Sequence, residues 1–96
     1  MTVEAVRPGA LAQRILDDGR ELVAYRTIFT TRLCLGAAGD PGYDDAWCYE
    51  SAIDCLYACA VWNGEGDPPG RWIRHIGSAR RREYVDGQLV REWVAQ

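Results

Sequence analysis

Residues 51–62 constrain the fold of this chain more than any other stretch, because they form its clearest helix. Ser51 with Asp54 three residues later is a capping box, and Asn63-Gly64 supplies a left-handed stop. The predicted inward stripe of this helix consists of Ile53, Leu56, Tyr57 and Ala60, widened by Ala52, Cys55 and Cys59. A helix this apolar needs a sheet to cover, so the rest of the chain is expected to supply strands.

Alternating apolar residues predict strands before this helix. Residues 10–16 and 21–29 form a predicted hairpin around Asp18-Gly19, with a short helix over 10–18 as the alternative. Residues 30–37 follow as a third strand, with Leu33 and Leu35 on one face and Cys34 on the other. After the Gly-, Pro- and Asp-rich loop 38–45, residues 46–49 suit a short strand.

A second turn-rich loop, residues 63–70, separates the helix from the C-terminal strands. Residues 71–77 alternate Trp72 and Arg74 on one face with Ile73 and His75 on the other. This strand pattern does not indicate which of the two faces is buried. Residues 81–94 predict a hairpin around Asp86-Gly87. The expected anchors of that hairpin are Tyr84, Leu89 and Trp93.

These elements predict a single α+β domain over residues 1–96, with one central α-helix packed on a small, mainly antiparallel β-sheet. Residues 1–9 lack periodicity and contain Pro8-Gly9, so we expect a loosely held arm there. Glu4 and Arg7 interrupt the apolar run that a secretory signal needs, and no segment approaches the roughly 20 apolar residues of a membrane span. We therefore expect a cytoplasmic protein that does not act at a membrane.

The four cysteines, Cys34, Cys48, Cys55 and Cys59, are expected as free thiols in such a compartment. Cys55 and Cys59 stand four apart and share a helix face, so a four-thiolate zinc site is one interpretation. Zinc knuckles place paired cysteines in turns, whereas this pair lies among apolar helix residues, where a thiol stays protonated. We interpret the cysteines as packing residues and expect no metal or other cofactor.

An acidic stretch separates Arg32 from Arg71, with seven carboxylates and no basic residue. Such a run can imitate a phosphate backbone and occupy an arginine-lined site on another protein. Tryptophan is enriched at binding hot spots, and four tryptophans exceed what one small core readily hides. The predicted partner-binding surface consists of Asp40, Asp44, Asp45, Glu65, Asp67 and Trp62.

Residues 71–82 form the opposite charge pattern, with five arginines and no acid. Arginines interleaved with an aromatic ring can bind phosphates and stack a base. The alternative nucleic-acid-binding set is Trp72, Arg74, His75, Arg80, Arg81 and Arg82. Against it, the whole chain carries a net charge of -3, and the cluster can instead pair with acidic residues inside the fold.

Nothing in the sequence indicates a catalytic site. His75 is the only histidine, and a Cys-His nucleophilic pair would need a thiol near it and a group to orient the ring. Asp44-Asp45 is a carboxylate pair within a turn-rich loop, where solvated caps are the commoner role. No phosphate-binding glycine loop or nucleophile elbow is present. We therefore expect a protein that is not an enzyme.

Residues 42–84 resemble a pattern in short proteins of Proteobacteria and their phages. The resemblance lies in Tyr43, Trp47-Cys48-Tyr49, an Ala-rich helix ending in Trp62-Asn63-Gly64, then Gly66, Pro68, Gly70, Trp72 and Arg74-His75 before a run of arginines. It implies a phage or prophage setting and no particular activity. The leading hypothesis is an interaction protein that inhibits or modulates a host nucleic-acid-processing or defence complex; a nucleic-acid-binding accessory domain is the alternative. Exposed hairpin edges also make a homodimer compatible with the sequence.

Overall fold

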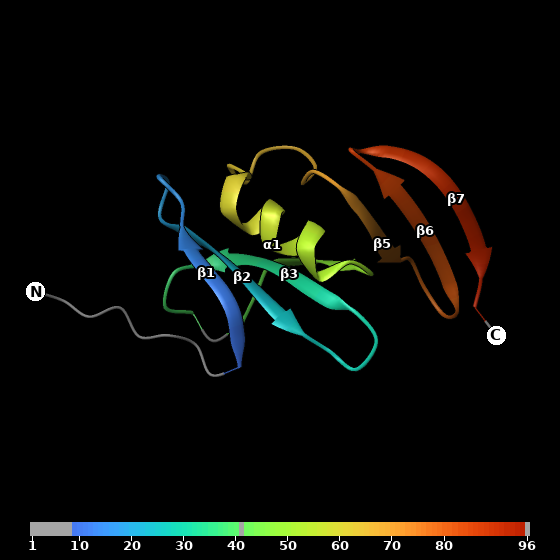
Figure 1. The fold of residues 1–96 in the computed structure, drawn as a ribbon, viewed down its shortest axis with the longest axis horizontal. Coiled ribbons are helices and arrows are strands. Elements are labelled where there is room, and N and C mark those ends of the chain that lie inside the picture. Colours follow the sequence, from blue (N-terminus) through green and yellow to red (C-terminus); the bar gives the residue numbers. More distant parts are fainter. Residues whose placement is uncertain (1–8, 41, 96) are drawn as a thin grey trace, which may run out of the picture.

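A computed structural model of the chain describes residues 9–40 and 42–95, so the predicted arm at 1–9 lies outside the described residues except for Gly9. Seven strands form one antiparallel sheet whose order across the sheet equals their order along the chain (Figure 1). The strands are β1 Ala10–Ile15, β2 Arg20–Arg26, β3 Thr31–Ala37, β4 Asp45–Tyr49, β5 Arg71–His75, β6 Arg80–Val85 and β7 Gln88–Val94. One helix, α1, spans Ala52–Val61 between β4 and β5.

The helix begins as the sequence predicts. Ser51 is the N-cap, and its hydroxyl oxygen accepts a hydrogen bond from the Asp54 backbone N–H at 3.2 Å. At the other end Trp62 is the C-cap in an extended conformation, and the left-handed Gly64, with φ of +86°, lies two residues further on. The stop therefore sits in the predicted region, although extended Trp62 rather than a left-handed residue ends the helix.

The predicted inward stripe of the helix is confirmed at Cys55 and Cys59 and wrong at Ile53 and Tyr57. Ile53 and Tyr57 are 78 % and 60 % exposed, whereas Cys55, Ala58 and Cys59 are buried against the sheet. The reason is size: the sheet already presents large side chains such as Trp47 and Tyr49 on this face, so small helix residues allow close packing. The more hydrophobic stripe is consequently turned outward.

The helix is also not central. Its contacts are with β1 to β4, while β5, β6 and β7 extend away to one side (Figure 1). The sheet is nearly interrupted between these halves, because the only register pair between β4 and β5 in the described residues is Cys48 with Ile73. The fold is therefore a mostly β, seven-stranded antiparallel sheet with one short helix over its N-terminal half.

The first hairpin is confirmed, and the alternative helix over residues 10–18 is wrong. β1 and β2 pair from Ala10 to Ile15, and left-handed Gly19, with φ of +88°, provides the turn. The third strand is confirmed as well, with Leu33 and Leu35 in the core below α1. Cys34 points to the other face but is also buried, with an exposed fraction of 3 %.

The C-terminal hairpin is confirmed around Asp86 and Gly87, which have φ of +48° and +83°. Tyr84 anchors it by stacking on Trp72 with the ring centroids 4.5 Å apart. Leu89 does not anchor it, since it is 53 % exposed. This hairpin extends beyond the helix, so no second layer is available to cover Leu89.

Candidate functional site

The predicted acidic surface is divided between two loops and partly neutralised. Asp40 and Asp44 are exposed before β4. Asp45 accepts two hydrogen bonds from Arg74, at 2.6 and 3.1 Å. After α1, Glu65 lies 3.3 Å from Arg20, and Asp67 lies beside the β6–β7 turn, where a Cβ on Gly87 would be 3.1 Å from its carboxylate.

Trp62, the aromatic member of that predicted surface, is a core residue. Its exposed fraction is 5 %, and its ring packs edge-on against Trp47 with the centroids 5.0 Å apart. The indole N–H donates to the Glu65 carbonyl at 3.0 Å. Trp62 is therefore not available to a partner, which corrects the prediction: its position at the helix end places it over the sheet.

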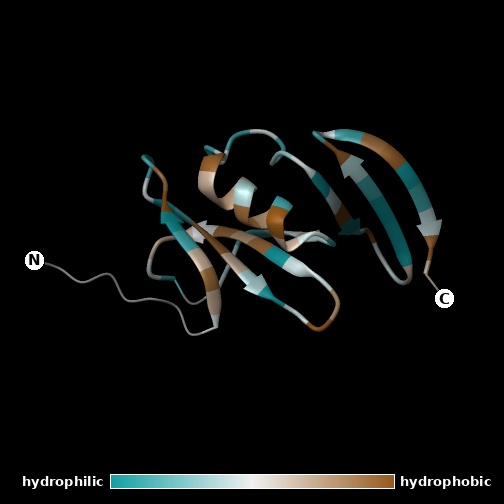
Figure 2. Ribbon diagram, viewed as in Figure 1, coloured by the Kyte–Doolittle hydropathy of each residue, from teal (hydrophilic) through white to brown (hydrophobic). Residues whose placement is uncertain are grey.

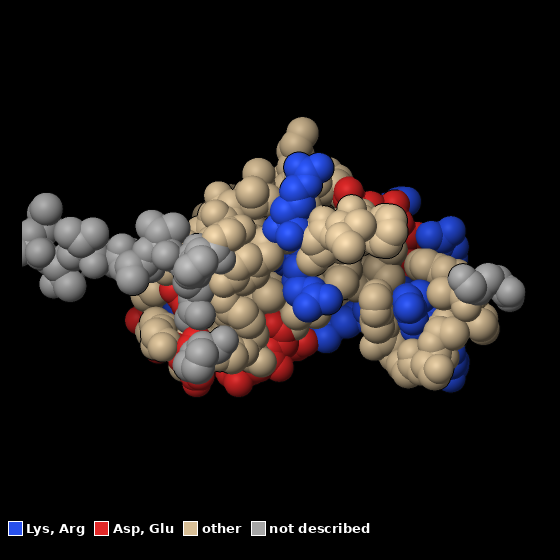
Figure 3. All heavy atoms as spheres, turned by 90° about the horizontal axis from the view of Figure 1, so that it is seen from below, with Lys and Arg blue, Asp and Glu red and all other residues tan. Residues whose placement is uncertain are grey.

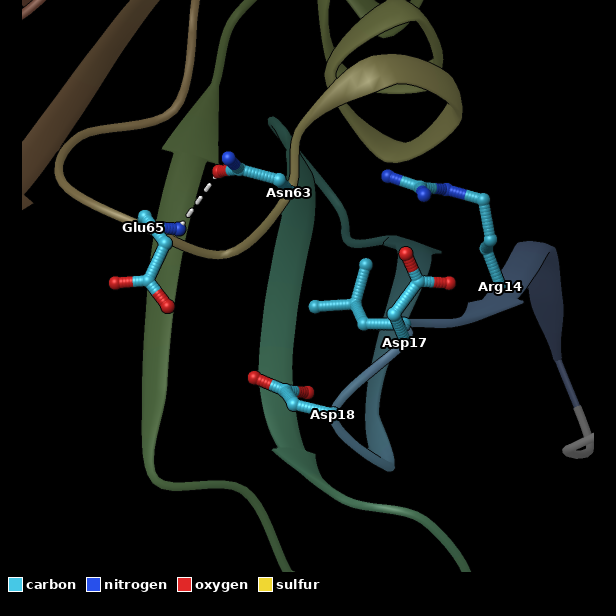
Figure 4. Close-up of a pocket in the computed structure, with 6 residues that line it drawn as sticks. Arg14, Asp17, Asp18, Asn63 and Glu65 are labelled. Carbon is cyan, nitrogen blue, oxygen red and sulfur yellow. Dashed lines mark hydrogen bonds between the residues drawn. The ribbon is translucent and has the colours of Figure 1, made fainter.

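A pocket of about 250 Å³ lies where the loop after α1 meets the β1–β2 turn (Figure 4). Its lining is Arg14, Leu16, Asp17, Asp18, Asn63 and Glu65. The carboxylates of Asp17, Asp18 and Glu65 point in different directions in Figure 4. Among the described residues no group of three or more His, Cys, Asp or Glu side chains is placed to hold a metal ion.

The arginines beside this pocket complete the end of α1. The last turn of the helix has no basic residue of its own. Arg14 donates to the Cys59 carbonyl at 2.7 Å and to the Trp62 carbonyl, and Arg20 donates to the Gly64 carbonyl at 3.2 Å. These positive charges satisfy carbonyls at the negative end of the helix. The pocket is thus part of the contact between the first hairpin and α1.

Most of the predicted arginine cluster is paired with carboxylates. Glu92 lies within ion-pair distance of both Arg80 and Arg82. Buried Glu83, 4 % exposed, lies 3.6 Å from Arg71 and 3.2 Å from Arg91. The carboxylates come mainly from β6 and β7 themselves rather than from the acidic stretch, so these arginines stabilise the C-terminal hairpin.

Two further members of the predicted nucleic-acid-binding set, Trp72 and Arg74, pack against residues of the core. Trp72 is 2 % exposed, and its indole N–H donates to the Pro68 carbonyl at 2.9 Å. Stacking of a base on Trp72 is therefore wrong as a prediction, because Tyr84 already occupies its face. Arg74 lies over Trp47, 4.8 Å from the ring centroid, and pairs with Asp45.

The packing interpretation of the helix cysteines is confirmed. Cys55 and Cys59 are 0 % and 2 % exposed. Burial raises the pKa of the Cys55 thiol to about 12 and also raises the pKa of Cys59. Both sulfurs are therefore neutral and unreactive near neutral pH. Cys48, by contrast, is only partly buried and lies on the opposite sheet face.

On that face the structure brings together residues that the sequence patterns did not connect. A groove of about 410 Å³ is lined by Thr27, Ile28, Phe29, Thr30, Arg32, Cys48 and His75. Ile28 and Phe29 form the tip of the β2–β3 hairpin and are 90 % and 89 % exposed; Figure 2 shows this tip as hydrophobic. The signal that could have found the tip is an apolar dipeptide between two threonines where the chain must turn.

His75 and Cys48 thus line one groove, although no hydrogen bond joins them among the described contacts. Burial lowers the pKa of His75, and the charges of Arg81 and Arg32 lower it further. In Figure 3 arginine side chains cross the middle of the visible face, whereas acidic side chains gather mostly at its lower left. Arg32 lines the groove and Arg81 is the register partner of His75, so positive charge borders the groove.

Comparisons with known proteins give no identity: no protein-family model, curated protein or solved structure matches the chain. Within residues 9–40 and 42–95 no helix is long and apolar enough to cross a membrane. The surfaces described above are consequently the basis for any functional conclusion.

Proposed function

We propose that this chain is a small non-enzymatic interaction protein that binds a basic partner protein through the outward face of α1. The observation that carries the proposal is the exposure of Ile53 and Tyr57, at 78 % and 60 %, on a helix whose other face is already buried. The exposed apolar residues of this face are Ile53, Leu56, Tyr57 and Val61. Their spacing of three and four residues is typical of a stripe that packs against another surface.

Charge at both ends of the helix indicates what kind of partner fits. Glu50 and Asp54 lie at the N-terminal end, and Glu65 lies just past the C-terminal end with 77 % of its side chain exposed. Two copies of the chain with their helices packed in parallel would bring the carboxylates of Glu50 and Asp54 together, which disfavours that arrangement. A partner with an apolar patch bordered by arginine or lysine has the complementary chemistry.

This proposal keeps the acidic character of the sequence-based hypothesis and replaces Trp62 by Tyr57 as its aromatic contact. Tyrosine is enriched at the centres of interfaces, where truncation costs about 2 kcal/mol or more. The phage or prophage setting, and a host nucleic-acid-processing or defence complex as the target, rest on the resemblance described above. They belong to the proposal as its expected biological context.

The test is affinity purification of the tagged protein from lysate of a bacterial host, with two double variants. Ile53→Ser with Tyr57→Ser removes the helix stripe; Leu89→Ser with Val94→Ser removes two exposed apolar residues from β7 as a control. We expect one set of proteins to be retained by the wild type and the control and lost with the helix variant. Because the contact is partly electrostatic, those proteins should elute between low and moderate salt. Equal retention by the helix variant, or retention that salt does not weaken, would contradict the proposal.

A further inference from the structure

The groove on the sheet face opposite α1 has the size and lining of a ligand site. Its volume of about 410 Å³ falls within the roughly 300–1,000 Å³ of small-ligand pockets. A second hollow of about 230 Å³ shares Arg32, Cys48 and His75 with it and continues toward Ile73. The floor is low because Ala46 and Cys48 are small, and the exposed hairpin tip forms one wall.

Positive charge also borders the groove: Arg32 lines it, and Arg81 lies beside His75, while Glu83 on the same face is paired with Arg71 and Arg91. His75 is the register partner of Arg81, and Cys48 is the register partner of Arg32, so these side chains share one sheet face. Among the described residues, neither Arg32 nor Arg81 forms an ion pair, and Arg81 donates only to the Arg80 carbonyl at 3.0 Å. Every other arginine of β5 to β7 is paired with a carboxylate.

The aromatic ring at the rim lies on a turn that is closed by hydrogen bonds between Thr27 and Thr30. The Thr27 backbone N–H donates to the Thr30 carbonyl at 2.8 Å, and the Thr30 backbone N–H donates to the Thr27 hydroxyl at 3.1 Å. The two hydroxyls are 2.9 Å apart. Phe29 is therefore presented to solvent on a hydrogen-bonded turn at the rim of the groove.

We propose that this groove binds single-stranded nucleic acid, with phosphates at Arg32 and Arg81 and a base stacked on Phe29. Positive grooves with exposed aromatic rings bind single strands because every base has a face to stack. A double helix hides those faces. An extended acidic peptide is a poorer occupant, because it could pair with the arginines but has no base to stack on Phe29.

The site is independent of the proposed function, because it lies on the face of the sheet that α1 does not cover. It also differs from the set predicted from the arginine run: Arg80 and Arg82 are paired with Glu92, and Trp72 is buried. Variants of the helix stripe should leave nucleic-acid binding unchanged. Failure of one proposal is therefore distinguishable from failure of the other.

The first measurement is fluorescence anisotropy of labelled oligothymidylate and oligouridylate of about 12 nucleotides, titrated with the full chain at low salt. Phe29→Ala is expected to weaken binding about tenfold, in line with base–aromatic stacking. Leu89→Ala removes an exposed apolar side chain elsewhere and should leave the affinity unchanged. Unaltered affinity in Phe29→Ala would overturn the proposal, as would an absence of binding by the wild type.

A second measurement uses charge. Arg32→Gln should lower the affinity and reduce the slope of log affinity against log salt by about 0.7, the value for one phosphate contact on a single strand. Arg80→Gln makes the same charge change at an arginine paired with Glu92 and should keep the slope. Equal slopes for the two variants, or displacement of the oligonucleotide by polyglutamate at the same charge concentration, would overturn the proposal.

Cys48 provides a readout of where the ligand lies. It is the one partly exposed cysteine, since Cys34, Cys55 and Cys59 are buried. Saturating oligonucleotide is expected to slow alkylation of Cys48 severalfold. An unchanged alkylation rate under saturation would place the ligand outside the groove and overturn the proposal.

Discussion

At the scale of single residues, the helix cysteines determine how closely α1 approaches the sheet. The buried Cys59 thiol donates a long hydrogen bond to the Leu22 carbonyl, with the sulfur and oxygen 3.9 Å apart. Cys55 is completely buried, and its thiol is held neutral by that burial. Both residues pack as small apolar side chains. Because their thiols can still ionise, we expect them to affect the pH dependence of stability rather than to react.

The raised pKa of Cys55 predicts a loss of stability in alkali. Its pKa rises from 9.0 to about 12 on folding, so between these values the folded state keeps a proton that the unfolded state has lost. The free energy of unfolding should therefore fall as the pH rises above about 9, by at most about 1.4 kcal/mol per pH unit for this thiol. Urea titrations at several alkaline pH values, with a reductant present, measure this slope. Cys55→Ala should make the slope shallower, and an identical slope in that variant would refute the assignment.

At the scale of elements, α1 has two apolar faces of different kinds. The small face, with Cys55, Ala58 and Cys59, contacts the sheet, and the larger face, with Ile53 and Tyr57, contacts solvent. Helix periodicity alone favours the face with the larger residues. The choice depends on what the sheet presents, and here its large aromatic rings leave room only for small helix side chains.

This arrangement predicts opposite tolerances on the two faces. Cys59→Leu should lower the free energy of unfolding by about 1–3 kcal/mol, because the added carbons have no space above the sheet. Ile53→Ser, on the exposed face, should change it by less than about 0.5 kcal/mol. Urea denaturation followed by circular dichroism compares the two variants directly. A larger loss for Ile53→Ser than for Cys59→Leu would show that the helix is turned the other way.

The parts of the fold that the sequence predicts are those with local signals. Ser51 with Asp54 defines the helix start, and Asp-Gly pairs define the first and last hairpins. The groove has no such local signal. Arg32 on β3 precedes α1 in the chain and His75 on β5 follows it, and the two strands are brought near each other because both neighbour β4 in the sheet. Likewise, Trp62 and Trp72 look like surface hot spots in the sequence until packing against Trp47 and Tyr84 is known.

At the scale of the whole molecule, side chains join the two halves of the sheet where the backbone hardly does. One register pair connects β4 to β5 in the described residues. The Arg74 guanidinium on β5 lies 4.8 Å from the ring centroid of Trp47 and 5.8 Å from that of Trp72, and it donates two hydrogen bonds to Asp45 on β4. This cluster therefore holds the C-terminal strands to the rest of the domain.

Arg74→Lys is predicted to be disruptive although it keeps the charge. Lysine cannot make the two hydrogen bonds to Asp45 in this geometry or present a planar cation to the Trp47 ring, so the free energy of unfolding should fall by about 1–2 kcal/mol. Hydrogen exchange in β5 to β7 should accelerate more than in β1 to β3, because the lost contact joins these halves. Arg80→Lys, at an exposed pair, is the matched control and should leave both measurements close to wild type.

The sequential order of the strands also sets the route by which the chain reaches this structure. Five of the six connections between successive strands are short, so contact order within each half is low and both halves should form rapidly. The connection from β4 through α1 to β5 is the exception, and it gains a single backbone pair on closing. Docking of the preformed halves is thus the expected late step of folding.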